Sequence, residues 1–392
     1  MARIERIAFV CPRLAKGSTV GGAETLLREL AVRAAENGCH VTFLATCATD
    51  HFTWKNALPP GRSEWRGMQV HLFPVDEDRD HGAFLEAQRS ISRGAPLRDG
   101  DEETWLRHGA VSRDLANYLR EHQGDYDRIV AGPYLFGLVV QVCRIRPDKT
   151  FLVPCLHDEP FARVPAIGDM FRSVRGILFN TEPERDLAVR IYEALPASAV
   201  VGIGIPAFQA DGDRFRQKHG LAAPYILYSG RREELKGTPL LLDYFAAFRL
   251  RTGKRMDLVL TGSGPVEVPA AVAAHVHDVG FISEADKRDA MAGALAFCHP
   301  SVYESLGIVI LEAWMAGTPA LVHSRSTVLR FHCRRSGGGL WFRAYPDFEE
   351  ILLRFLNDPV LVGRLGECGK AYVSREYGWE TVSARLFEAL AR

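Results

Sequence analysis

PSVYESLGIVILEAWMAGTP, residues 300–319, is the stretch of sequence from which we assign the fold of the rest of the chain. A short apolar run (294–298) precedes it, and an apolar helix pattern after Gly307 is closed by Gly317 and Pro319. The pattern predicts a strand, a loop and a helix that begins near Gly307. The backbone N–H groups at such a helix start can hold a phosphate or another anionic oxygen.

Two carboxylates bracket this helix start, Glu304 in the turn before it and Glu312 on its second turn. Eight residues at helical rise span roughly 12 Å. That exceeds the separation of paired carboxylates in glycoside hydrolases, which is about 5 Å or about 6.5–9.5 Å. We therefore expect the two to hold different ends of one extended ligand, such as the sugar and the ribose of a nucleotide sugar. Spacing alone favours a plainer interpretation, a capping glutamate and a solvated one.

The stretch closely resembles the signature of retaining glycosyltransferases of family 4. In that signature a Glu, seven residues and a second Glu are followed by Ala-x-x-x-Gly-x-Pro, which here are Glu304, Glu312, Ala313, Gly317 and Pro319. The resemblance implies an α/β fold of two Rossmann-like, doubly wound domains facing a cleft, the GT-B architecture. It also implies that the first domain binds the acceptor and the second the nucleotide sugar.

Composition fits a globular protein of about two domains, with 392 residues. Lys plus Arg and Asp plus Glu number 48 each, so no net charge favours nucleic acid as a partner. We expect no signal peptide and no membrane span. Eight scattered Cys favour reduced thiols in a cytoplasmic protein. Peripheral contact with the inner membrane face is left open.

The first domain opens as a strand, a Gly-rich loop, a helix and a strand, which is the pattern of a parallel sheet. Gly21 and Gly22 let a ligand approach the backbone at a helix start, although a flexible loop explains them equally well. The resembled family often has Gly-Gly followed two positions later by Glu, as in Gly21, Gly22 and Glu24. In that family this loop lines the cleft, so the resemblance implies that Gly21 and Gly22 contact the donor. The expected strands and helices are 4–11, 23–37, 40–46, 102–121, 128–131, 134–144, 150–156, 175–179, 182–194 and 200–203.

The strand over 150–156 ends in the polar run His157-Asp158-Glu159. Open α/β sheets bind ligands at the carboxyl ends of their strands, so we predict that His157 contacts the sugar or the acceptor. In the resembled family a His often stands here, near the transferred sugar. Residues 50–100 are predicted to be an irregular insertion. Five arginines at its end and in the following helix are predicted to lie on a solvated face of mixed charge, namely Arg89, Arg93, Arg98, Arg107 and Arg113.

The domain boundary is expected near residue 206, so that residues 1–206 and 207–375 form the two domains. A last helix, 376–392, is expected to pack back on the first domain, as the resemblance implies.

The second domain begins with a strand over 225–229 and the loop GRREELKG, residues 230–237. Arg231 and Lys236 flank the start of a helix. There the two parallel N–H donors of a guanidinium and the charge of an ammonium can together bind a diphosphate. Spacing alone favours a solvated charged loop, but Gly-Arg-x-x-x-x-Lys-Gly matches the donor-phosphate contacts of the resembled family. Gly230 and Gly262, each at a strand end, would lie beside the nucleotide.

Residues 327–339 depart from the family pattern. They contain Arg330, Arg334 and Arg335, and we interpret them as a basic exposed loop.

The resemblance implies transfer of a sugar from a UDP- or GDP-sugar to an acceptor hydroxyl with retention of configuration. The acceptor would be a sugar, a lipid-linked molecule or a small molecule in bacterial cell-surface polysaccharide or glycoconjugate synthesis. Arg231, Lys236 and the backbone around Ser305, Leu306 and Gly307 would stabilise the leaving diphosphate. Glu304 would hold the sugar and Glu312 the ribose. No Asp-x-Asp motif stands at a convincing strand end, so we expect no metal and no other cofactor.

Three other functions stay open. A non-catalytic protein of this fold would bind a nucleotide sugar or glycan without turnover, and a nucleotide-sugar epimerase would need no acceptor. A dinucleotide-dependent oxidoreductase is disfavoured, because no G-x-G-x-x-G follows a predicted strand.

Overall fold

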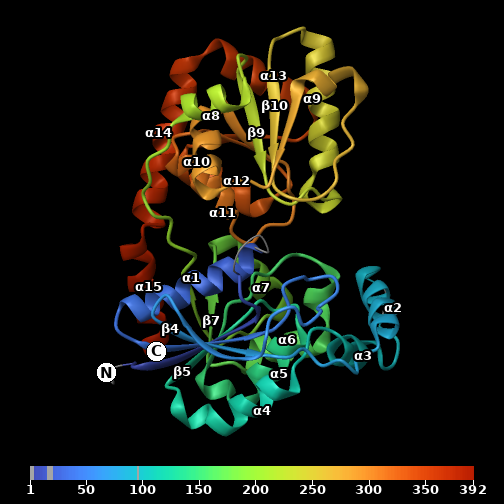
Figure 1. Ribbon diagram of the computed structural model, residues 1–392, viewed down its shortest axis with the longest axis vertical. Coiled ribbons are helices and arrows are strands. Elements are labelled where there is room, and N and C mark those ends of the chain that lie inside the picture. The colour runs from blue at the N-terminus through green and yellow to red at the C-terminus, as the bar shows by residue number, and fades with distance from the viewer. Residues whose placement is uncertain (1–3, 16–20, 95–96) are drawn as a thin grey trace. The chain divides into compact units, whose positions relative to one another are not determined.

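The structure, a computed structural model, describes residues 4–15, 21–94 and 97–392. The chain divides into two compact units. The N-terminal unit is the chain up to Ile203 together with Val382–Arg392, and the C-terminal unit is Gly204–Thr381. Each unit is a largely parallel sheet covered by helices (Figure 1).

The sheet of the N-terminal unit has the strand order β3-β4-β2-β1-β5-β6-β7-β8. All neighbouring strands run parallel except the hairpin of β3 and β4. The chain fills one side of β1 first and then the other, so the order reverses between β1 and β5. The strands are β1 (Arg6–Arg13), β2 (His40–Thr46), β3 (Gly61–Trp65), β4 (Met68–Phe73), β5 (Arg128–Ala131), β6 (Thr150–Leu152), β7 (Gly176–Phe179) and β8 (Ala197–Val200).

The end of the chain packs on this unit. Arg33 Nε donates to Ser383 Oγ at 3.0 Å, and Arg128 Nε donates to the Leu390 carbonyl at 2.7 Å. The helices are α1 (Gly22–Glu36), α2 (His81–Ser92), α3 (Asp101–His108), α4 (Arg113–His122), α5 (Gly137–Ile145), α6 (Pro165–Ser173), α7 (Glu182–Tyr192) and the last helix, α15 (Trp379–Ala391).

The sheet of the C-terminal unit has the order β11-β10-β9-β12-β13-β14, with all neighbours parallel. Numbered within the unit this is 3-2-1-4-5-6, and the order reverses between β9 and β12. Its strands are β9 (Tyr225–Ser229), β10 (Asp257–Thr261), β11 (Val276–Gly280), β12 (Ala296–His299), β13 (Ala320–His323) and β14 (Gly339–Phe342). Its helices are α8 (Gly212–His219), α9 (Thr238–Thr252), α10 (Glu284–Gly293), α11 (Ile308–Met315), α12 (Thr327–Ser336), α13 (Tyr345–Asn357) and α14 (Pro359–Glu376).

Each sheet has an apolar core of its own. Val10, Ile167 and Phe171 are buried in the N-terminal unit, and Phe245 and Leu260 in the C-terminal unit. Both cores are large enough for each unit to hold its strand ends, and thus the loops that follow them, in fixed positions.

The predicted exposed loop over 327–339 is wrong, because this stretch forms helix α12 and the start of β14. Ser326 caps the helix by accepting from the Leu329 N–H, and Gly337 ends it in the left-handed conformation. Its inner face is formed by Val328, Leu329, His332 and Cys333, which are buried. Arg334 and Arg335 are exposed on this helix.

Four other predicted elements need correction. The strand predicted over 150–156 ends at Leu152, because Pro154 has no N–H to donate to a neighbouring strand. The helix predicted over 102–121 is two helices, α3 and α4, because the chain turns at Gly109 and Ser112 then caps α4. The last N-terminal strand is Ala197–Val200 instead of 200–203, because its partner β7 ends at Phe179, opposite Val200. Residues 50–100 are more regular than predicted and contain β3, β4 and α2.

Candidate active site

The loops that follow β9 and β12 lie next to each other, because these two strands are neighbours at the point where the strand order reverses. Lys236, in the loop before α9, places its Nζ 2.7 Å from Oε1 of Glu304 in the loop before α11. His299, the last residue of β12, places its Nε2 3.0 Å from the same oxygen. We call Lys236, His299 and Glu304 the switch-point cluster.

Glu304 is an ionised carboxylate in this cluster. Burial raises its pKa, but the charge of Lys236 and the hydrogen bond from His299 outweigh burial and hold the pKa well below the usual range. His299 is buried, and its ring stacks with those of Tyr228 and Phe297. Its Nδ1 has no hydrogen-bond partner among the described residues, so Nε2 carries the proton that it donates to Glu304.

Glu312 lies in a second ion pair. Nζ of Lys287, on α10, is 3.2 Å from Oε1 and 3.1 Å from Oε2 of Glu312. The same Nζ is 2.8 Å from Oε2 of Glu284. Burial raises the pKa of Glu312, and the charge of Lys287 opposes that rise. The two glutamates of the quoted stretch are therefore each held by a lysine of their own.

The start of α11 can bind an anion. Gly307 is its N-cap, in the left-handed conformation with φ of 76°, and no acidic residue stands in the first turn. A Cβ on Gly307 would lie 2.5 Å from Cδ2 of Leu329, so only glycine fits here without a shift. Ser305 and Leu306 complete the turn, and Leu306 is buried. The helix therefore begins, with its positive end, directly after the loop that carries Glu304.

Gly230 and Gly262 bring the ends of β9 and β10 into contact. A Cβ on Gly262 would lie 2.0 Å from the Gly230 carbonyl oxygen. The Gly230 N–H donates to the Thr261 carbonyl at 3.1 Å, and the Gly262 N–H donates to the Gly280 carbonyl at 2.8 Å. These contacts hold the start of the loop that carries Arg231 and Lys236.

Arg231 and its neighbour Arg232 have different surroundings. The Arg231 side chain is 43% exposed and lies 3.1 Å from Glu233. Arg232 is buried, where it pairs with Asp278 and donates to the Gly264 carbonyl at 3.0 Å. Arg232 thus ties loops together, and Arg231 is the arginine that solvent or a ligand can reach.

Gly21, Gly22 and His157 belong to the N-terminal unit. Gly21 is the N-cap of α1, where Glu24 forms a buried ion pair with Arg13. His157, in the loop after β6, places its Nδ1 3.6 Å from Oε1 of Glu159. All three follow the carboxyl ends of parallel strands, the edge of the sheet at which such folds bind ligands.

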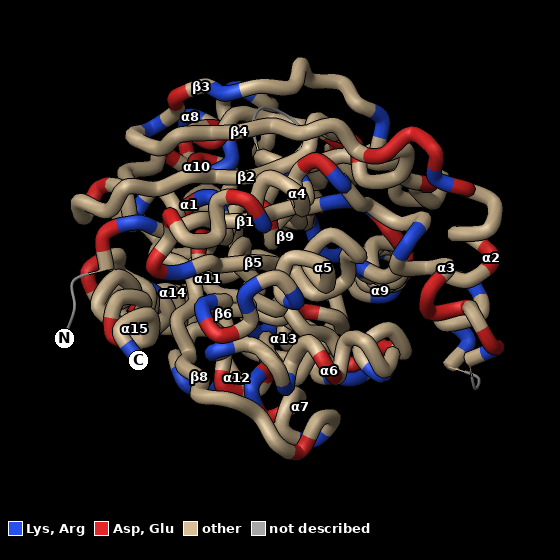
Figure 2. Tube along the Cα trace, turned by 90° about the horizontal axis from the view of Figure 1, so that it is seen from below, with Lys and Arg blue, Asp and Glu red and all other residues tan. Residues whose placement is uncertain are grey.

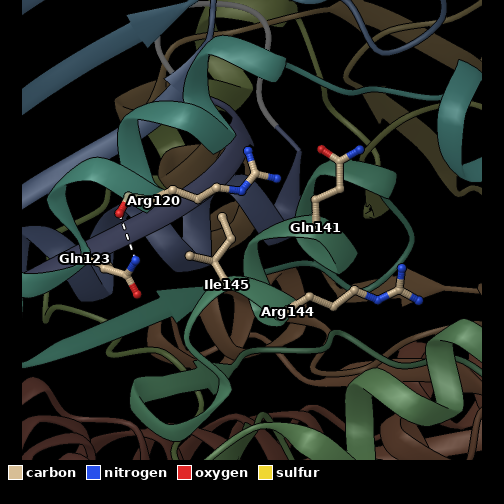
Figure 3. Close-up of a pocket in the computed structure, with 5 residues that line it drawn as sticks. All are labelled: Arg120, Gln123, Gln141, Arg144 and Ile145. Carbon is tan, nitrogen blue, oxygen red and sulfur yellow. Dashed lines mark hydrogen bonds between the residues drawn. The ribbon is translucent and has the colours of Figure 1, made fainter.

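A hollow of about 500 Å³ on the N-terminal unit lies elsewhere (Figure 3). It is lined by Arg120, Gln123, Gln141, Arg144 and Ile145. Arg120 and Gln123 lead into the start of β5, and Ile145 ends the helix that leads into β6. The hollow thus lies toward the amino ends of the strands, away from the edge that carries His157.

Charged residues of both signs are interspersed along the chain (Figure 2). Arg113, one of the arginines predicted to lie on a mixed-charge face, is 2.9 Å from Asp76 and 2.7 Å from Asp78. Within residues 4–15, 21–94 and 97–392, no three His, Cys, Asp or Glu side chains gather as a metal site would require.

Sequence reasoning missed His299 and Lys287. His299 stands directly before the quoted stretch, at the end of a predicted strand, and that position was its signal. Lys287 lies on a mixed-charge helix twenty-five residues before Glu312. Nothing in its local pattern distinguishes it from a solvated lysine.

Comparison with known proteins supports a transferase. Residues 211–372 match the family model of glycosyl transferases group 1. A D-inositol 3-phosphate glycosyltransferase of Streptomyces scabiei is 27% identical over 395 residues, covering 94% of this chain and 85% of the relative. A phosphatidyl-myo-inositol mannosyltransferase of Mycobacterium tuberculosis is 30% identical over 180 residues, covering 42% of this chain and 47% of the relative.

The protein is a glycosyltransferase. Solved structures share its fold. A sucrose-phosphate synthase of Thermosynechococcus elongatus superposes with a TM-score of 0.73 at 17% identity, covering 98% of both chains. The Anabaena protein HepE in complex with UDP-glucose gives 0.68 at 17% identity, covering 98% of this chain and 99% of the other. The predicted fold class, two Rossmann-like α/β domains, is confirmed.

None of the helices in the described part of this glycosyltransferase combines the length and the apolar character that crossing a membrane requires.

Proposed function

We propose that this glycosyltransferase belongs to the retaining enzymes of family 4 and transfers a sugar from a UDP- or GDP-sugar to an acceptor hydroxyl. The observation that carries the proposal is the switch-point cluster, in which Lys236 and Glu304 meet beside the start of α11. A cation, a helix N-terminus and an ionised carboxylate stand together there. This set suits a ligand with a diphosphate at one end and sugar hydroxyls at the other.

The reaction breaks the bond between the anomeric carbon and the diphosphate oxygen, and the electron pair leaves with the diphosphate. Lys236 and the N–H groups at the start of α11 would stabilise that growing charge, as preorganised donors do in other enzymes. Arg231 would add a fork to the diphosphate when the donor is bound. A bond forms between the acceptor oxygen and the anomeric carbon on the same face, and the acceptor proton passes to the leaving phosphate.

Glu304 would accept hydrogen bonds from sugar hydroxyls and so orient the anomeric carbon. His299 donates a hydrogen bond to this carboxylate, which helps to fix its orientation. Glu312 would accept hydrogen bonds from the ribose hydroxyls of the nucleotide. Gly230 and Gly262 would let the nucleotide approach the backbone.

The acceptor would bind to the N-terminal domain, residues 1–206, near His157, and the donor to residues 207–375. The two relatives named above act on inositol 3-phosphate and on phosphatidyl-myo-inositol, as their names state. We therefore expect a polyhydroxylated acceptor, free or lipid-linked, in bacterial cell-surface glycoconjugate synthesis on the cytoplasmic side. The transfer would proceed without a metal ion, because Lys236, Arg231 and α11 supply positive charge at the diphosphate.

The test is turnover with a panel of UDP-, GDP- and ADP-sugars and of acceptors that includes inositol phosphates. Lys236→Ala and Glu304→Ala should each reduce transfer by at least a hundredfold while the far-UV spectrum stays unchanged. Lys218→Ala, which removes an exposed lysine of the same unit, is the control and should retain full activity. Full activity in either site variant would contradict the assigned roles.

The same assay separates the alternatives. Release of nucleotide only when an acceptor is present supports transfer. Conversion of the donor sugar without acceptor would indicate an epimerase, and binding without any turnover would indicate a non-catalytic protein.

A further inference from the structure

Lys287 is a lysine held between two carboxylates of unequal exposure. Its own side chain is 17% exposed, that of Glu312 is 20% exposed and that of Glu284 is 68% exposed. Solvent screens the pair with Glu284 far more than the pair with Glu312. Glu312 is therefore the partner with which Lys287 interacts most strongly.

The geometry at Glu312 shows what this lysine does. Oε1 accepts a hydrogen bond from Lys287 Nζ at 3.2 Å. Oε2 is buried and makes no hydrogen bond with the described residues, although the same Nζ lies 3.1 Å away. The buried negative charge of Oε2 is thus balanced by the ammonium of Lys287. Arg288, the next residue on α10, adds a weaker favourable charge, and Glu284 opposes it.

We propose that Lys287 is a positioning residue for donor binding: it keeps Glu312 ionised and in one orientation, so that this carboxylate accepts hydrogen bonds from the ribose hydroxyls. The inference rests on the proposed function, in which Glu312 faces the ribose. Lys287 itself touches neither sugar nor phosphate in this assignment.

Loss of the ammonium should act through the ribose alone. Without Lys287, burial favours the protonated form of Glu312. A neutral acid is a weaker acceptor than a carboxylate, because hydrogen bonds to an ionised group are roughly twice as strong. The diphosphate contacts of Lys236 and α11 are separate from this pair and should be unchanged.

The experiment compares a ribonucleotide with its dideoxy form. Dissociation constants are measured by calorimetry for UDP and GDP, and for the 2′,3′-dideoxy form of whichever binds more tightly. Wild type should prefer the ribonucleotide by roughly tenfold or more. In Lys287→Met the ribonucleotide should bind roughly tenfold more weakly and the dideoxy form within about twofold of wild type. In turnover, KM for the donor should rise with little change in kcat.

Two further variants serve as controls. Lys218→Met removes a lysine whose Nζ lies 2.9 Å from Asp286 on the exposed side of the same helix, and it should keep the wild-type preference. Lys287→Arg retains the charge and should restore most of the preference for the ribonucleotide. If Lys287→Met does not fold, Lys287→Gln, which keeps a donor in place of the methyl group, takes its place in the comparison.

The outcomes separate the two proposals. An equal loss of affinity for both nucleotides in the variant would show a merely structural role and overturn the inference. A variant that keeps the wild-type preference would overturn it as well. Wild type that binds both forms equally would remove the ribose role of Glu312. Wild type that binds neither UDP nor GDP would count against the proposed function itself.

Discussion

Glu184 is a fully buried carboxylate that ties together the loops on either side of it. Its Oε1 accepts from the Leu156 N–H at 2.6 Å, next to His157, and its Oε2 accepts from the Asn180 N–H at 2.5 Å. Burial raises the pKa of Glu184 to about 8, although these backbone hydrogen bonds lower it in part. The residue therefore takes up a proton when the chain folds at neutral pH.

The pH dependence of stability should reveal this proton. The folded pKa lies above the unfolded value of roughly 4.3, so the contribution of Glu184 to stability falls as pH rises through about 4.5 to 8. Glu184→Gln cannot titrate. Urea titrations should show that wild type loses about 3 kcal/mol of unfolding free energy relative to this variant between about pH 5 and pH 7.5. Wild type that gains stability relative to the variant over this range would contradict the assignment.

Individual site residues could be predicted where they belong to a short, recognisable sequence motif. Lys236 and Glu304 stand in two recognisable motifs, and the structure brings them to 2.7 Å. Lys287 was not predicted, because its partner Glu312 lies on another helix. His299 was not predicted, because only its 3.0 Å contact with Glu304 distinguishes it from a core histidine. Arg231 and Arg232 are adjacent, and only packing shows that the second is the buried one.

At the scale of the element, the start of α11 depends on glycine. Gly307 has φ of 76° and Leu329 would lie 2.5 Å from an added Cβ. Gly307→Ala should cost roughly 1–2 kcal/mol for the left-handed conformation. Because Leu329 must also shift, the loop with Glu304 should move, and kcat/KM should fall by roughly tenfold to a hundredfold.

Gly317→Ala is the matched control for this prediction. Gly317, just after the end of the same helix, has φ of 86° and open space around an added Cβ. It should lose similar stability, measured by thermal unfolding, but keep kcat/KM within about twofold. Equal loss of activity in both variants would show that general destabilisation, and no local shift, lowers the rate.

Helices and strands could be predicted where the spacing of apolar residues was regular. They could not be predicted where a capping residue determines where a helix begins. The helix after Gly307 follows from a run of apolar residues between two glycines. Helix α12 was missed because its stripe contains His332 and Cys333, a buried pair of polar and sulfur side chains. The exposed basic residues on its outer face made this stretch resemble a charged loop, although its buried residues have helical spacing.

For the whole molecule, two separate cores mean that a ligand of one unit need not affect the other. A nucleotide at a hundred times its dissociation constant stabilises the folded form that binds it by about 2.7 kcal/mol. Amide hydrogens that exchange by local opening should be protected first where the ligand binds. We therefore expect UDP or GDP to slow exchange at 230–237 and 299–312, in the C-terminal unit.

Hydrogen-exchange mass spectrometry with and without nucleotide measures this directly. Peptides that cover 120–145, around the hollow of the N-terminal unit, serve as the internal reference and should exchange at unchanged rates. The Lys236→Ala variant should lose the protection at 230–237 and 299–312 at the same nucleotide concentration, because it removes the cation that the proposed function assigns to the diphosphate. Protection confined to 120–145 would instead place the nucleotide on the N-terminal unit, away from Glu304.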